Sequence, residues 1–148
     1  MEKELVKKFE EVRLHTEHIC KRLKTEDYSV QPSVDVSPPK WHLAHSTWFF
    51  EQFILVPYKK DHKIFDDDFA YLFNSYYNNA GERVLRPDRG LMTRPTVEDV
   101  YSYREYVTKN MLDLLQKNLD QNILDLVIIG INHEQQHQEL LAVGIPIL

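Results

Sequence analysis

Two histidines near the carboxyl end of the chain are the residues whose type and spacing most clearly suggest chemistry. They stand four positions apart in the segment His133-Glu134-Gln135-Gln136-His137, and four positions are about one turn of an α-helix. In a helix, both imidazole rings would project from one face at neighbouring heights. Because transition metals bind neutral imidazole well, this pair predicts two ligands of one metal ion.

The same five residues fit the H-E-x-x-H pattern of zinc proteases, in which the glutamate, here Glu134, is the general base. A histidine pair needs at least one more ligand. After His137 only Glu139 is a candidate, and it points about 200° around the helix from His137. The third ligand is therefore expected upstream, where His45 lies within an apolar stripe of another predicted helix. Glu134 could also lie behind the ligands or at the rim of such a site.

The expected ligand set of three neutral imidazoles leaves about half of an octahedral coordination shell open. This arrangement resembles the facial triad of non-haem iron(II) oxygenases, with an imidazole in place of the carboxylate. Three histidines and a water molecule also form catalytic zinc sites, so zinc remains an alternative. His42 projects from a different direction of its predicted helix than His45, and we expect it to be structural or to support the ligands.

Arg86 and Arg89 are a second feature of the sequence. Their guanidinium groups stand three positions apart in a predicted loop and could bind a carboxylate together. Gln136 directly precedes His137 and could reach a polar group of a substrate. For all three residues, an ordinary solvated side chain is the alternative.

Four amphipathic helices must position these residues. Apolar residues recur at three-to-four spacing in residues 2–24, 37–55, 96 onward and 120 onward. Ser37 is predicted to cap the second helix, with Pro38 as its first residue, and Pro57 to end it. Thr96 and Asp99 form a capping box that opens the third helix. The absence of strand signals predicts an all-α bundle, whose core is a common place for metal sites.

The connection between the second and third helices, residues 58–95, is too long to be slack inside a compact domain. We expect it to pack against the bundle through its aromatic residues, which are Tyr71, Phe73, Tyr76 and Tyr77. Gly130, three positions before His133, is expected to leave room beside that imidazole.

Composition limits the class of protein. The 148 residues suggest one domain, with 43% hydrophobic and 28% charged residues, as in soluble globular proteins. A net charge of -5 argues against a nucleic-acid surface. The sequence contains no run of ~18 apolar residues, the length needed to cross a membrane. Cys20 is the only cysteine, which excludes an intrachain disulfide, and the charged N-terminus does not resemble a signal peptide. These features predict a cytoplasmic protein.

Four segments of the chain together resemble the N-terminal DinB-like domain of ergothioneine-biosynthesis sulfoxide synthases. They are Trp41-His42-Leu43-Ala44-His45-Ser46-Thr47-Trp48-Phe49-Phe50-Glu51, Phe73-Asn74-Ser75-Tyr76-Tyr77, Arg86-Pro87-Asp88-Arg89-Gly90-Leu91 and the stretch 133–141. They occur in the expected order within residues 37–141, and their combination is specific, whereas H-E-x-x-H alone is not.

The resemblance implies a DinB-like four-helix bundle with a long packed connection between helices 2 and 3. It implies a non-haem iron(II) enzyme that uses O₂ to join the thiol of cysteine or γ-glutamylcysteine to the imidazole of hercynine, giving a sulfoxide. Related enzymes make ovothiol or selenoneine. By motif, the iron ligands would be His45, His133 and His137. The carboxylate of the thiol substrate would bind Arg86 and Arg89, and Gln136 would lie near hercynine.

The chain departs from this family at its carboxyl end. Full-length synthases continue into a second domain similar to sulfatase-modifying factors, which supplies a catalytic tyrosine. The sequence here stops at Leu148, so we expect an incomplete enzyme that needs a C-terminal partner domain. Two alternatives stay open: a stand-alone DinB-like thiol transferase or hydrolase that uses zinc or nickel, and a metal-binding fragment without catalysis.

Overall fold

The structure is a computed structural model that describes residues 2–74 and 86–147. Its helical elements in chain order are α1 (Glu2–Ile19), η1 (Thr25–Ser29), α2 (Pro39–Phe50), η2 (Glu51–Leu55), α3 (Val56–Tyr58), α4 (Phe69–Leu72), η4 (Arg86–Leu91), α5 (Val97–Leu115), α6 (Gln121–Gly144) and η5 (Ile145–Ile147). The described part of the chain has no strand, only an isolated bridge between Ser33 and Val36. None of the described helices combines the length and the apolar character needed to cross a membrane.

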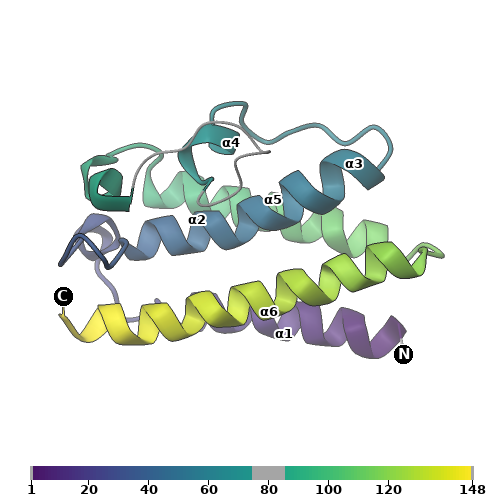
Figure 1. Ribbon diagram of the computed structural model, residues 1–148, viewed down its shortest axis with the longest axis horizontal. Helices are drawn as coiled ribbons and strands as arrows, with labels where there is room; N and C mark the ends of the chain where they lie inside the picture. The colour runs from purple at the N-terminus through teal and green to yellow at the C-terminus, as the bar shows by residue number, and fades with distance from the viewer. Residues whose placement is uncertain (1, 75–85, 148) are drawn as a thin grey trace.

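The four long helices form a bundle, which confirms the predicted all-α class. α2 packs against α5 and α6, and α1 packs against the same two helices. Figure 1 shows that α2 and α5 run in one direction along the long axis, while α1 and α6 run in the other. Since α2 and α5 are parallel, the chain must return along the bundle between them, which explains the long connection.

Local capping signals locate some helix ends but not others. α5 begins after Thr96, whose side chain accepts from the Asp99 amide in the predicted capping box. α1 ends at Ile19, about five residues before the predicted end of the first helix at residue 24. Here the Tyr28 hydroxyl donates to the carbonyl of Cys20 at 3.1 Å. The same carbonyl also accepts from the Leu23 amide at 3.0 Å, so a backbone turn and the nearby Tyr28 together satisfy it where the helix ends.

The second helix is shifted by one residue and extended relative to its prediction. Pro38, not Ser37, is the N-cap, and the helix begins at Pro39. The prediction that Pro57 ends the helix was also wrong, because helical backbone continues through the π-helix η2 to the end of α3 at Tyr58. The wider π turn ahead of Pro57 accommodates a residue that an α-helix does not tolerate in its interior.

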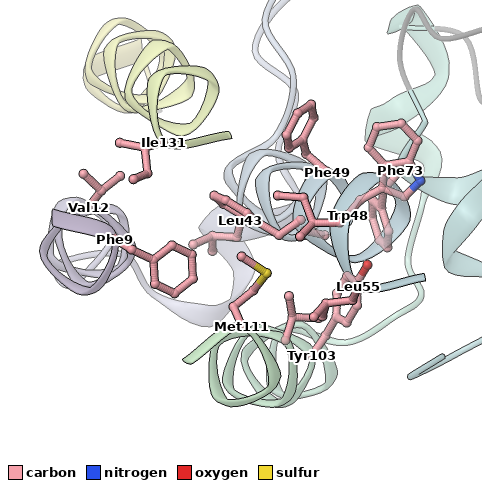
Figure 2. Close-up of a cluster of buried hydrophobic side chains, with 14 of the residues drawn as sticks. Phe9, Val12, Leu43, Trp48, Phe49, Leu55, Phe73, Tyr103, Met111 and Ile131 are labelled. Atoms are coloured by element: carbon pink, nitrogen blue, oxygen red, sulfur yellow. The ribbon is translucent and has the colours of Figure 1, made fainter. Parts of the chain in front are cut away.

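α2 is the central helix of the molecule, and all twelve of its residues are buried. Figure 2 shows Leu43 and Trp48 surrounded by apolar side chains of the neighbouring helices, among them Phe9, Met111 and Ile131. A helix buried on every side must find partners for its polar side chains inside the protein. The histidines of α2 are therefore held by protein groups.

The connection packs onto this helix, as predicted. Trp48 Nε1 donates to the carbonyl of Ala70 at 3.2 Å, and Lys40 Nζ donates to the carbonyl of Met92 at 3.0 Å. Of the expected aromatic anchors, Phe73 is fully buried, whereas Tyr71 is 46% exposed and is not an anchor. The other two, Tyr76 and Tyr77, lie outside the described residues.

Buried Glu51 fixes the start of the connection. Its Oε2 accepts from His62 Nε2 at 2.9 Å and from the Phe65 amide at 3.2 Å, and its Oε1 accepts from the Tyr103 hydroxyl at 3.3 Å. A buried carboxylate with several donors holds the loop, η2 and α5 together.

Candidate metal centre

Three imidazoles converge where the middle of α2 packs against α6. His133 Nε2 lies 3.1 Å from His45 Nε2 and 3.2 Å from His137 Nε2. One ligand atom from each histidine lies within 4.8 Å of the other two. The structure therefore brings together the three residues that the sequence suggested as ligands, 88 positions apart in the case of His45 and His133.

These separations fit a shared metal ion. With metal–nitrogen distances of ~2.1 Å, nitrogens 3.1 and 3.2 Å apart subtend an angle of ~95–100° at the metal. This angle lies between those of an octahedral and a tetrahedral site, so the geometry accommodates iron(II) or zinc. A metal bound here would have three protein ligands and open positions for water or substrate.

Burial keeps the three imidazoles neutral. It is the largest cause that lowers the pKa of each ring: that of His45 well below 6.5, that of His133 to about 4, and that of His137 further still. The neighbouring imidazoles lower the pKa of His45 and His137 in addition. Neutral rings offer the lone pairs that metal binding requires.

The ring of His45 is oriented by the connection. Its Nδ1 lies 2.5 Å from the carbonyl oxygen of Phe73, and because a carbonyl cannot donate, the proton must be on Nδ1. Nε2 of His45 therefore presents a lone pair toward His133. His133 Nδ1, by contrast, is buried and has no hydrogen-bond partner among the described residues. A proton on His133 Nε2 could be donated to only one of the two neighbouring Nε2 atoms, those of His45 and His137, at a time. A cation could accept lone pairs from all three nitrogens at once.

A stack of flat side chains joins the metal centre to the second sequence feature. The guanidinium carbon of Arg89 lies 3.6 Å from the ring centroid of Trp41. Trp41 stacks on His45 with centroids 4.4 Å apart and an interplanar angle of 12°, and Trp48 also stacks on His45, with centroids 5.2 Å apart. Arg89 is buried and donates to Ser37 Oγ at 2.9 Å. Its guanidinium group is thus held at a fixed position relative to His45.

A cavity of about 320 Å³ lies beside the centre. Arg86 and Arg89 both line it, together with His137 of the metal cluster. The remaining lining residues are Asp35, Val36, Ser37, Trp41, His42, Leu140 and Val143. The cavity thus combines two cations with an imidazole of the metal centre, a suitable arrangement for a small acid with a metal-binding group.

Glu134 does not face the metal centre. It is fully buried, and its carboxylate accepts from Arg13 at 2.7 Å, from Arg104 at 3.0 Å and from the Thr16 hydroxyl at 2.6 Å. Burial alone would raise the pKa of Glu134, but the two arginines and Thr16 outweigh it and lower that pKa. An ionised carboxylate tied to α1 and α5 cannot activate a metal-bound water, so the zinc-protease interpretation does not fit.

Gln136 is exposed on α6 and is not among the residues that line the cavity. Gln138 is the buried glutamine of this segment, and it donates to the Val12 carbonyl at 2.9 Å. Gly130 also differs from expectation. A Cβ there would meet Phe50 Cε1 at 2.5 Å, so the missing side chain makes room for the aromatic rings of α2 and not for an imidazole.

Trp41 is a partner of the site that was not predicted from the sequence. Trp41 and His45 are four positions apart, so stacking on one helix face was a detectable signal. No comparable signal indicated that Arg13 and Arg104 would hold Glu134, because these partners come from other helices.

Comparison with known proteins agrees with this architecture. The sequence profile of the DinB superfamily matches residues 8–141. A search of curated proteins found no match to the chain.

Proposed function

The chain belongs to the DinB superfamily, and from this premise we propose that it is the metal-binding domain of a non-haem iron(II) sulfoxide synthase. The enzyme would use O₂ to join a cysteine-type thiol to hercynine, as in ergothioneine biosynthesis. The observation that carries the proposal is the position of Arg86 and Arg89 in one cavity with His137. The four segments that resemble the synthases, described above, support the choice of reaction.

The cavity residues have separate roles in this proposal. Arg86 and Arg89 bind the carboxylate of the thiol substrate, and Asp35, which lines the same cavity, complements its ammonium group. With the carboxylate held there, the thiol would lie in the cavity that His137 also lines. Binding the substrate in this orientation converts the later steps into reactions between neighbouring groups.

The metal would be held by His45, His133 and His137, and iron(II) would supply the binding and reduction of O₂. The protein would hold the ring of His45 in place, since Trp41 and Trp48 both stack on it. Gln136, exposed beside this cluster, would contact the hercynine-like substrate. A C-terminal partner domain would complete the active site and supply its catalytic acid.

The test is an anaerobic reconstitution of the protein with iron(II), followed by addition of cysteine, hercynine and O₂. We expect stoichiometric iron and a product with the mass of the sulfoxide conjugate, with a sulfatase-modifying-factor-like domain supplied as a second chain. The control is the same mixture without thiol, which should give no product. Failure to bind iron(II), or binding without any affinity for cysteine, would contradict the proposal.

A second candidate is a DinB-like thiol transferase or hydrolase that uses zinc or nickel. The donor set of three neutral imidazoles and the nitrogen separations suit zinc as well as iron. Here the metal would activate a thiol or a water molecule. Predominant zinc in protein purified without air, together with no O₂ consumption in the presence of thiol, would favour this function over the first.

A further inference from the structure

His42 is a buried imidazole that the proposed reaction does not use. It is 4% exposed, and its Nδ1 lies 2.8 Å from Nδ1 of His137. Two imidazole rings in contact through one nitrogen each share a single proton in that contact, and either ring can supply it.

Metal binding removes this ambiguity. Nε2 of His137 is the atom that faces His133, at 3.2 Å. If Nε2 binds a metal, the proton of the neutral ring must be on Nδ1, which then donates to His42. His42 must accept at Nδ1 and carry its own proton on Nε2.

We infer that His42 is a positioning residue for His137, whose Nδ1–H it accepts so that Nε2 stays unprotonated and aimed at the metal. This inference rests on the metal centre of the proposed function, but not on the identity of the metal or of the substrate. A metal-binding histidine usually donates a hydrogen bond from the N–H of its second ring nitrogen to a carboxylate, a carbonyl or water. Here another imidazole takes that place, whereas His45 uses the Phe73 carbonyl.

The inference predicts opposite results for two substitutions. His42→Phe keeps a ring but removes the acceptor, and we expect Zn²⁺ affinity, measured by competition with a chromophoric chelator, to fall roughly 10- to 100-fold. His42→Asn restores an acceptor near the position of Nδ1, so its affinity should stay within about threefold of the wild type. Unchanged affinity in His42→Phe, or an equal loss in both variants, would overturn the inference.

His62→Phe is the matched control. His62 is another buried imidazole, and its hydrogen-bond partner is Glu51. Glu51 lies in η2, which continues the helix α2 that carries His45. This substitution should lower the Tm of the metal-free protein and leave Zn²⁺ affinity unchanged. A loss of affinity equal to that of His42→Phe would show that any buried imidazole matters and would overturn the specific role of His42.

A measurement on the wild-type protein makes the result independent of variant folding. Nitrogen-15 NMR of histidine-labelled, Zn²⁺-loaded protein reports which ring nitrogen carries each proton. We expect the proton of His137 on Nδ1 and that of His42 on Nε2. A His42 proton on Nδ1 with Zn²⁺ bound would overturn this inference alone, whereas failure to bind Zn²⁺ and iron(II) would overturn the metal centre as well.

Discussion

At the scale of single residues, stacking between planar side chains positions the groups of the candidate site. Arg89, Trp41 and His45 form a continuous stack from the cavity to the metal centre. Arg89 is buried and also bonded to Ser37, whereas Arg86 is only partly buried. Substitution of Arg86 therefore separates substrate binding from structural effects more cleanly than substitution of Arg89.

We expect Arg86→Ala to weaken cysteine binding to the metal-loaded protein roughly 10- to 100-fold, because a hydrogen bond to a charged group contributes ~1.5–3 kcal/mol. Metal content should not change. Isothermal titration calorimetry checks the affinity, with Arg94→Ala as the control, since Arg94 is exposed and lines a different pocket. Equal affinities for Arg86→Ala and the wild type would remove this residue from the substrate site.

At the scale of elements, a buried charge cluster holds the helices in the register that the metal centre needs. Glu134 lies between Arg13 of α1 and Arg104 of α5, and Arg13 also donates to Thr47 of α2 at 2.7 Å. The cluster therefore ties all four helices together. Because Glu134 follows His133 directly, fixing its carboxylate on one side of α6 fixes His133 on the side facing α2.

Glu134→Gln should destabilise the protein by ~3–5 kcal/mol, because it removes the carboxylate between two buried guanidinium groups and leaves Arg104 only Glu17, at 3.5 Å, as a counter-charge among the described residues. Urea unfolding of the metal-free protein measures this change in the free energy of unfolding. Glu139→Gln, an exposed position on the same helix, should alter it by less than ~0.5 kcal/mol. If both variants unfold at the urea concentration of the wild type, the cluster does not stabilise the bundle.

Gly130 is the point of closest approach between α6 and the aromatic rings of α2. A Cβ at this position would lie 2.5 Å from Phe50 Cε1 and 3.0 Å from Phe49 Cε1. Gly130→Ala should therefore cost ~1–3 kcal/mol through overpacking, although alanine favours a helix by ~1 kcal/mol over glycine. For Asn132→Ala, at an exposed neighbouring position, urea unfolding should instead show a higher free energy of unfolding. A Gly130→Ala protein more stable than the wild type would show that the rings move aside easily.

At the scale of the whole molecule, spacing along the sequence predicts local features, and apart from His45 as the third ligand it did not predict partners from distant segments. The capping box of Thr96 and the His133–His137 pair are local, and both were located from spacing alone. The predicted end of α1 was wrong because the backbone turns after Ile19, where the Cys20 carbonyl accepts from the Leu23 amide and from the Tyr28 hydroxyl. His42 and His137 are in contact although they are 95 positions apart in the sequence. Spacing along a single helix cannot predict such a contact.

The hydrophobic pattern of the sequence also did not predict that α2 is buried on every side. Its apolar stripe indicated one buried face, but the connection also covers Lys40 of α2, whose Nζ donates to the Met92 carbonyl at 3.0 Å. A helix covered in this way loses its amphipathic pattern. The long connection itself was correctly predicted to pack, since a slack segment of that length is uncommon.

Metal binding should stabilise the whole bundle, because the ligands come from two helices that pack together. At a free metal concentration of 100 times the Kd, the expected gain is ~2.7 kcal/mol, or ~5–10 °C in Tm for a chain of this size. A chelator should reverse it. Differential scanning calorimetry tests this, with the exposed His18 replaced by alanine as the control that keeps the gain. A Tm unaffected by iron(II) and zinc would contradict a shared site.

The central claim is that one metal ion binds His45, His133 and His137 together. It is tested most directly by the iron content of protein reconstituted anaerobically with iron(II) and passed through a desalting column. We expect stoichiometric iron in the wild type and none in His45→Ala, His133→Ala or His137→Ala. Stoichiometric iron in all three variants would contradict it.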